Sequence, residues 1–210
     1  MDLYFSPLAC SMATRIAFHE AGIEGRFIAV DTRTKRLADG TDFLAVNPMG
    51  QVPVLRMDSG ELLTENPAVL QYVADQRPEA GLAPRNGIDR YRLQQWLNFI
   101  TSELHKVVFV PLLDPAMPED GKAYARQKAE LRLAYLNGSL DGREHLLKRF
   151  TVADAYLATV LNWARYTGVD LARWPAVKRY MDIIYQRPSV TKAIEEETRA
   201  YQEQEARRRA

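Results

Sequence analysis

The residue with the clearest chemical potential in this sequence is the cysteine at position 10. Cys10 is the only cysteine among the 210 residues, and it stands between a short β-rich run, 3–5, and an apolar repeat of helical spacing, 12–21. The unpaired N–H groups and the positive dipole end of such a helix stabilise a thiolate. The third position after Cys10 is Ala13, so any redox chemistry requires an external thiol. The alternative is an inert cysteine packed in the loop.

Two more side chains are suited to activating a sulfur nucleophile. Ser11 is either the cap of the helix that follows it or a hydroxyl donor to a bound thiolate. His105 can donate a proton near neutral pH, or it is simply a solvated or capped histidine. Asn98 and Ser102 precede His105 at spacings that place all three on one helix face, apart from the apolar stripe.

Three places in the sequence are suited to holding a small zwitterionic peptide. A Val52–Pro53 bond in a sharp turn, in the cis form if the turn requires it, would leave the N–H and C=O of Val52 free for an extended ligand. Glu65 and Asn66 precede a helix start that can receive a carboxylate, and Glu65 can accept from an ammonium group. Lys35 can pair with a second carboxylate. The plainer interpretations are a turn, helix capping and an exposed cation.

The elements that position these residues fall into two halves. Residues 1–77 read as strand, helix, strand, loop, two strands and helix, the pattern of an α/β domain with a partly parallel sheet. Residues 78–87 are rich in Pro, Gly and charge, which indicates a linker. Residues 88–210 are helical throughout, with an apolar stripe that continues to Val107. The charged end, 195–210, is interpreted as a solvated terminal helix without a function.

Composition argues against several classes of function. With 28 basic and 27 acidic residues the formal charge is +1, so no global field attracts nucleic acid or an acidic membrane. The sequence has no basic leader and no apolar run near the roughly 18 residues that span a bilayer. A lone cysteine fits a reducing compartment, and no metal-ligand spacing occurs. We expect a cytoplasmic protein that uses no metal and binds neither nucleic acid nor membrane.

Six short segments, in this order and over essentially the whole chain, resemble the glutathione transferases, and most closely their bacterial beta class. They are 6–11 (SPLACS), 47–53 (NPMGQVP), 63–65 (LTE), 96–98 (WLN), 103–106 (ELHK) and 150–156 (FTVADAY). The last includes a capping box, Thr151 to Asp154, before an apolar helix that should lie at the centre of its domain.

The resemblance implies a thioredoxin-like N-terminal domain (1–77), an all-α C-terminal domain (88–210) that carries the hydrophobic-substrate site, a homodimer, and a glutathione site at the domain junction. In similar enzymes the cysteine matching Cys10 lies beside the glutathione sulfur and can form a mixed disulfide with it. The positions of Ser11 and His105 help to activate the thiol. The positions implied to hold the tripeptide, some from the partner subunit, are those of Cys10, Lys35, Val52, Glu65, Asn66, Asn98, Ser102, Glu103 and His105.

Two positions depart from the family pattern. Asn66 stands where the family often has Ser, although its amide can still donate to a carboxylate. The stretch before Phe150 is one residue short and lacks the usual Gly, so the loop there should be shaped differently.

The leading hypothesis is a glutathione transferase that lowers the pKa of the bound thiol and directs the thiolate at an apolar electrophile, as in detoxification. Glutathione is then a co-substrate. One alternative is glutathione-dependent thiol–disulfide exchange through a Cys10 mixed disulfide. Another is a non-catalytic ligand-binding protein, suggested by Tyr156, Trp163 and Tyr166 in the helical half.

Overall fold

The structure, a computed structural model, describes residues 1–209 and forms two compact units. One unit joins Met1–Leu82 to the last helix, which begins at Pro188, and the other is Ala83–Arg187. The division after Leu82 falls within the stretch 78–87. The last helix groups with the N-terminal unit, whereas its helical pattern had placed it with the helical half, because it packs against α1 and its Arg208 binds Asp31 of β2.

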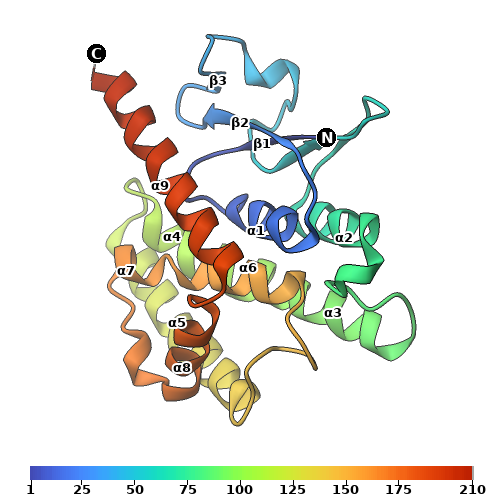
Figure 1. Cartoon of the computed structure of the whole chain (residues 1–210). Helices are drawn as coiled ribbons and strands as arrows, with labels where there is room; N and C mark the ends of the chain where they lie inside the picture. The colour runs from blue at the N-terminus through green and yellow to red at the C-terminus, as the bar shows by residue number, and fades with distance from the viewer. Residues whose placement is uncertain (210) are drawn as a thin grey trace. The chain divides into compact units, whose positions relative to one another are not determined.

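The first unit is a mixed five-stranded sheet with the helices α1 and α2 on one face (Figure 1). The sheet order is β3-β2-β1-β4-β5; β1 and β2 are parallel and the other pairs are antiparallel. Its elements are β1 (Asp2–Phe5), α1 (Met12–Ala21), β2 (Arg26–Asp31), β3 (Arg36–Leu37), η1 (Phe43–Ala45), β4 (Val54–Arg56), β5 (Leu62–Leu63), α2 (Asn66–Gln76), η2 (Pro78–Ala80) and α9 (Pro188–Arg209).

Local sequence explains most of this unit. The central strand β1 is buried on both faces, since α1 packs below it while Tyr4 packs with Val30, Phe43 and Val54 above. Helix α1 ends at Gly22, which takes the left-handed conformation that a non-glycine residue adopts at a cost. The predicted strands and helices are confirmed. The exception is β3, which lies in the stretch interpreted as a loop, because a two-residue edge strand shows no apolar alternation.

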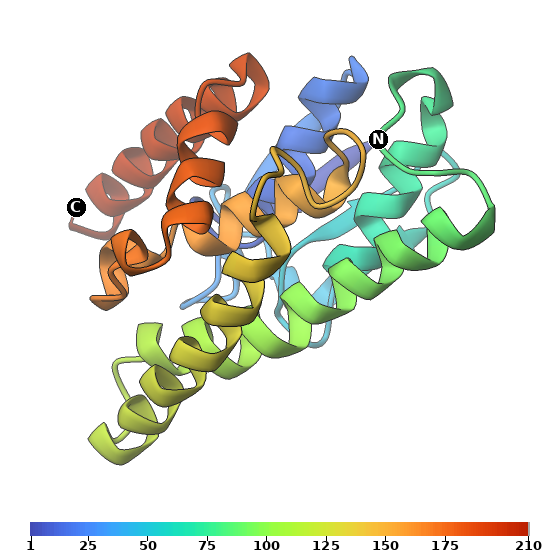
Figure 2. The ribbon, with the colours of Figure 1, turned by 90° about the horizontal axis from the view of Figure 1, so that it is seen from below.

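The second unit is all helical (Figure 2). Its elements are α3 (Gly87–Phe99), η3 (Ile100–Phe109), α4 (Val110–Leu113), α5 (Glu119–Leu140), α6 (Val152–Leu161), α7 (Ala164–Thr167), η4 (Leu171–Arg173) and α8 (Pro175–Ile184). All ten residues of α6 are buried, which confirms its predicted central position. Helix α5 packs back along η3.

The capping box at the start of α6 forms as predicted and is larger than expected. The carboxylate of Asp154 accepts the N–H of Thr151 at 2.9 Å, and also the N–H of Leu146 at 2.9 Å and the hydroxyl of Tyr180 at 3.1 Å. Because these donors come from the loop before α6 and from α8, one buried carboxylate joins three segments of the unit.

The segment η3 is a π-helix that continues α3 without a break. Its i→i+5 hydrogen bonds widen each turn, so successive side chains rotate less about the axis than in an α-helix. The apolar stripe therefore shifts, and Val108 is fully buried where the α-helical spacing predicted Val107.

The interpretation of 195–210 as a solvated helix is wrong for one face of α9. That helix lies beside α1 (Figure 1), and it buries Val190, Ala193, Glu197 and Gln204. Near its end the guanidinium of Arg208 binds Asp31 of β2 at 2.7 Å. Within residues 1–209, no helix has the combination of length and apolar character that crossing a bilayer demands.

Candidate functional site

Cys10 lies in the loop between β1 and α1, at the start of the helix as predicted. Its side chain is half-buried, and its Sγ donates to the carbonyl oxygen of Val52 at 3.3 Å. The loop is shaped by a turn in which the N–H of Ala9 donates to the carbonyl of Ser6 at 3.1 Å. The sulfur therefore stands against the segment that leads into β4.

Ser11 is completely buried and faces the interior of its own loop. Its hydroxyl donates to the carbonyl of Ser6 and accepts from the N–H of Ser6, each at 3.2 Å. It stands at the N-cap position of α1 but makes no side-chain cap. The hydroxyl thus fixes the turn that leads to Cys10.

The Val52–Pro53 peptide bond is cis, as the sequence analysis considered. The carbonyl of Val52 is not free, because the Cys10 thiol donates to it. The N–H of Val52 finds no acceptor among residues 1–209. One backbone donor of this turn therefore remains for an extended ligand.

Lys35 lies against the segment that leads to Val52. Its ammonium group donates to the carbonyl of Gly50 at 3.0 Å. A Cβ at position 50 would come 2.9 Å from Cδ of Lys35, and the φ of Gly50 is +60°, so glycine is the residue that fits here with least strain. The lysine stem is thereby held beside the turn.

Asn66 is buried at the start of α2, and its amide bonds both α1 and the Cys10 loop. Nδ2 donates to the carbonyl of Cys10 at 3.1 Å, and Oδ1 accepts from the hydroxyl of Thr14 at 3.0 Å. Nδ2 carries a second N–H, so a contact of this amide with a ligand carboxylate stays a prediction. Glu65, just before it, has an exposed side chain and no side-chain cap bond. Because Pro67 has no N–H and that of Ala68 donates to the Glu65 carbonyl, the backbone donor that the helix start offers a carboxylate is the N–H of Asn66.

Three non-glycine residues of the chain's described part have a positive φ, and all three belong to this region. They are Leu8 at 60°, Lys35 at 57° and Glu65 at 65°. Such conformations are costly for residues with a Cβ and tend to gather at ligand sites. Two of them are predicted site residues, and the third lies two positions before Cys10.

His105 belongs to the helical unit and is buried there among aromatic rings. Its Nδ1 shares a hydrogen bond of 2.7 Å with the hydroxyl of Tyr156, and the ring centroid of Trp163 lies 5.0 Å away. Burial, with a smaller contribution from the charge of Lys106, lowers the pKa of His105 to about 4. The imidazole is therefore neutral at neutral pH.

The predicted polar face does not include His105. Asn98 and Ser102 are exposed, whereas His105 is buried, because the π-helix rotates it away from the face that α-helical spacing predicts. The amide of Asn98 donates to the carbonyl of Gln94, and the hydroxyl of Ser102 donates to the carbonyl of Asn98. Glu103 forms an ion pair of 2.7 Å with Arg132.

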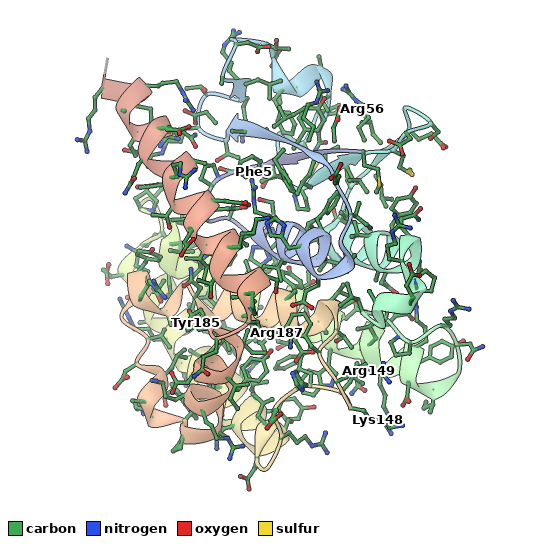
Figure 3. The ribbon with its side chains drawn as sticks, in the orientation of Figure 1. Phe5, Arg56, Lys148, Arg149, Tyr185 and Arg187 are labelled. Carbon is green, nitrogen blue, oxygen red and sulfur yellow. The ribbon has the colours of Figure 1, made fainter. Side chains whose placement is uncertain are left out.

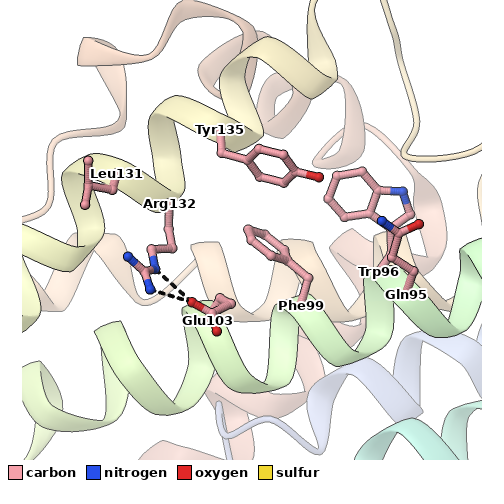
Figure 4. Close-up of a pocket in the computed structure, with 7 residues that line it drawn as sticks. All are labelled: Gln95, Trp96, Phe99, Glu103, Leu131, Arg132 and Tyr135. Carbon is pink, nitrogen blue, oxygen red and sulfur yellow. Dashed lines mark hydrogen bonds and ion pairs between the residues drawn. The ribbon is translucent and has the colours of Figure 1, made fainter.

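A groove of about 480 Å³ has α3 and η3 on one side and α5 on the other (Figure 4). Trp96, Phe99 and Tyr135 form its aromatic wall, with ring centroids 5.2 to 6.2 Å apart. The ion pair of Glu103 and Arg132 closes one end. Of the predicted site residues only Glu103 lines this groove, and no sequence pattern had indicated the groove.

Tyr156 and Trp163, which suggested a ligand-binding role, are core residues of the helical unit. Both are nearly inaccessible to solvent, while Tyr166 is exposed. Among residues 1–209, no cluster of three or more His, Cys, Asp or Glu side chains is arranged to hold a metal ion.

The fold and the cysteine site together define a thioredoxin-like domain joined in one chain to an all-helical unit. Models of known protein families match both parts of the chain. The description "Glutathione S-transferase, N-terminal domain" matches residues 9–76, and "Glutathione S-transferase, C-terminal domain" matches residues 100–188. The chain belongs to the glutathione S-transferase family.

Similar proteins agree with this assignment. Glutathione S-transferase GstA of Escherichia coli O157:H7 is 44% identical over 200 residues, which cover 94% of this chain and 98% of that protein. A sphingomonad glutathione S-transferase solved with glutathione is 47% identical with a TM-score of 0.90, over 94% of this chain and 99% of that one.

A bacterial beta class glutathione S-transferase of Sphingomonas chungbukensis is 45% identical with a TM-score of 0.90, over 94% of this chain and 98% of that one. These likenesses confirm the predicted family, fold class and transferase activity.

Proposed function

We propose that the first unit binds glutathione along the Val52–Pro53 turn, with its sulfur beside Cys10, and that the bound thiolate attacks an apolar electrophile. The observation that carries this proposal is the contact of the Cys10 thiol with the Val52 carbonyl, next to an unused Val52 N–H. An extended tripeptide that pairs with Val52 brings its own cysteine to this point.

The start of α2 suits one end of the tripeptide. The backbone N–H of Asn66 points from the positive end of the helix dipole, so it favours a carboxylate, whereas Pro67 has no N–H and that of Ala68 donates to the Glu65 carbonyl. Glu65 is exposed and accepts from the ammonium group of the same amino-acid end. Lys35, beside Gly50, suits the second carboxylate. We retain Asn98, Ser102 and Glu103 as predicted contacts from the helical unit or its partner copy.

In the proposed reaction, the protein accelerates conjugation by favouring the ionised form of the glutathione thiol. A free thiol with a pKa near ~8.5 is only a few per cent ionised at pH 7, and a shift of about two units makes most of it a thiolate. The thiol proton passes to solvent and the thiolate forms a new sulfur–carbon bond. The electrophile then either releases its leaving group with the bonding pair or, if the thiolate adds to a double bond, the π bond breaks and the carbanion takes up a proton from solvent. His105, neutral at this pH, acts as a hydrogen-bond partner rather than as a cation. Ser11 contributes by fixing the Cys10 turn.

Calorimetry and absorbance test this function directly. Glutathione titrated into the protein should release heat with one site per chain, and the ultraviolet absorbance of its thiolate should titrate well below the value for free glutathione. A generic aromatic halide should then give the conjugate. Absence of binding heat, or an unshifted thiol titration, would contradict the proposal.

A second candidate activity is thiol–disulfide exchange, favoured by the half-buried Cys10 at the start of α1. The Cys10 thiolate would attack a mixed disulfide of glutathione, form Cys10–S–S–glutathione and release the other thiolate. A second glutathione thiolate would then regenerate Cys10 and leave as glutathione disulfide. A disulfide reductase assay run beside the conjugation assay distinguishes the two activities.

We also propose that the protein is a homodimer whose copies meet at the groove between η3 and α5. Trp96, Phe99 and Tyr135 present an apolar surface there, and Leu131 is exposed beside them. Apolar side chains gathered on one surface indicate an interface. The proposed setting is detoxification in the cytoplasm, without metal, nucleic acid or membrane, and it is consistent with a lone reduced cysteine.

A further inference from the structure

A single carboxylate of the last helix reaches the loop that carries Cys10. Oε2 of Glu197, on α9, accepts the N–H of Leu8 at 2.6 Å, although the two residues are 189 positions apart. The Glu197 side chain is 0% exposed. Leu8 has the left-handed φ of 60°. The next residue, Ala9, closes the turn that leads into Cys10.

The second oxygen of the same carboxylate holds the other side of Cys10. Oε1 of Glu197 accepts Nε of Arg15, on α1, at 3.0 Å. The Arg15 guanidinium lies 4.4 Å from the ring centroid of Phe5, labelled in Figure 3, and 4.0 Å from that of Phe27. Glu197 thus ties α9 to a residue before Cys10 and to a residue after it.

Packing alone does not account for this glutamate. Glu197 continues the buried stripe of α9 that includes Val190 and Ala193, a position where an apolar side chain would serve the core at least as well. A buried ion pair is often no more stabilising than a hydrophobic replacement, because both charges lose their hydration. Unlike an apolar side chain, the carboxylate of Glu197 accepts a hydrogen bond from the Leu8 N–H.

We propose that Glu197 is a positioning residue for Cys10: by holding Leu8 in its left-handed conformation, it sets where the Cys10 sulfur stands against the Val52 carbonyl. The inference rests on the proposed function only for its consequence in glutathione binding. The placement of the sulfur itself is independent of any ligand.

Burial makes the contact between Glu197 and Leu8 sensitive to pH near neutrality. Burial raises the pKa of Glu197 to about 7, against the lowering influence of Arg15 and the Leu8 N–H. The neighbouring Glu196 of α9 binds Arg15 at 3.1 Å and His19 at 2.9 Å. An ionised acceptor makes the stronger hydrogen bond, so the hold on Leu8 weakens as Glu197 takes up a proton.

Alkylation of the single cysteine tests the inference. We would compare Glu197→Gln with Glu196→Gln in the full chain. The measured quantity is the rate at which iodoacetamide modifies Cys10, from about pH 6 to about pH 9, a range that includes the titration of the thiol and of Glu197. A carboxamide has one oxygen for two donors, so Glu197→Gln leaves either Leu8 or Arg15 unmatched. Glu196→Gln also removes a charge beside Arg15, but Glu196 bonds Arg15 and His19 rather than the Cys10 loop.

We expect Glu197→Gln to change the alkylation rate about tenfold, as for loss of a hydrogen bond to a charged acceptor. It should also remove the inflection near neutral pH and raise the KM for glutathione more than it lowers kcat. Glu196→Gln should keep the wild-type profile. If both variants lose stability alike while Cys10 keeps its wild-type profile in each, Glu197 is merely structural and the inference is overturned.

Two further measurements keep the inference testable. Glu197→Asp retains the charge beside Arg15 but is one methylene short of Leu8, so it should reproduce the altered Cys10 profile. If neither Glu197 variant folds, exchange of the Leu8 amide proton in the unmodified protein decides: protection supports the inference, and exchange at the rate of an open loop overturns it. Failure of glutathione to bind the wild type would defeat the proposed function and leave the alkylation result intact.

Discussion

Nδ1 of His105 lies 2.7 Å from the phenolic oxygen of Tyr156, and both side chains are buried within the helical unit. A hydroxyl can donate to a neutral imidazole or accept from it. In either case the bond orients the ring without supplying the negative charge that would hold a proton on it. This arrangement explains why burial dominates and why the pKa of His105 falls to about 4.

Acid should destabilise the protein through this histidine. At a pH between the ordinary histidine pKa of 6.5 and the folded value of about 4, His105 is protonated in the unfolded chain and neutral in the folded chain. The stability that depends on a neutral His105 is therefore lost as pH falls from about 6.5 to 4, by up to about 3 kcal/mol. Urea unfolding of wild type and His105→Asn at pH 7 and pH 4.5, about the ends of this window, measures the difference. Parallel pH dependences would contradict the prediction.

The buried carboxylate of Asp154 should be among the most sensitive positions for stability. Asp154→Ala removes the acceptor for two backbone N–H groups and for the Tyr180 hydroxyl, so we expect a loss of roughly 3 to 5 kcal/mol in the free energy of unfolding. Asp141→Ala, at an exposed position, should cost less than about 0.5 kcal/mol. Chemical denaturation would show the contrast, and equal small losses would disprove it.

Replacing Cys10 should separate the two candidate activities. Cys10→Ala removes the sulfur that a mixed disulfide needs, so disulfide reductase activity should disappear while conjugation continues within a few fold, as an order of magnitude for a sulfur that is not the nucleophile. Cys10→Ser keeps a donor toward the Val52 carbonyl and should conserve glutathione affinity better than alanine. Mass spectrometry should find the mixed disulfide in the wild type only. Full reductase activity in Cys10→Ala would eliminate the exchange mechanism.

A charge in the aromatic groove should prevent dimer formation. Phe99 stands between Trp96 and Tyr135, with ring centroids at 5.6 and 5.2 Å, and Phe99→Glu would place an unpaired carboxylate in a buried interface. Analytical ultracentrifugation should then show a monomer. Tyr166→Glu, an exposed tyrosine outside the groove, is the matched control and should remain a dimer. A dimeric Phe99→Glu protein would place the interface elsewhere.

Sequence alone determined the local features of this protein. The helix of Met12–Ala21, the turn at Gly22, the capping box at Thr151 and the cis bond at Pro53 depend on interactions within a few residues. Their patterns can therefore be seen in the sequence. The same holds for Cys10, whose place at a helix start follows from the strand and the helix on either side of it.

Tertiary structure decided what each site residue contacts. Asn66 was predicted to contact a ligand, but no sequence pattern indicated that its amide also bonds Thr14 and the Cys10 carbonyl. His105 was predicted on an exposed polar face, but a π-helix turns it into the core. Both outcomes depend on how far the chain deviates from ideal helical rotation and on which distant groups come near.

The hydrogen bond from the Leu8 N–H to Glu197 shows why contacts between distant residues cannot be predicted from the sequence. The sequence places a glutamate in the buried stripe of a charged terminal helix, which signals an unusual residue but not its partner. Only the packing of α9 on α1 brings that carboxylate to a backbone N–H 189 residues away. Burial, desolvation and pairing are properties of the assembled neighbourhood, whereas periodicity and capping belong to the chain itself.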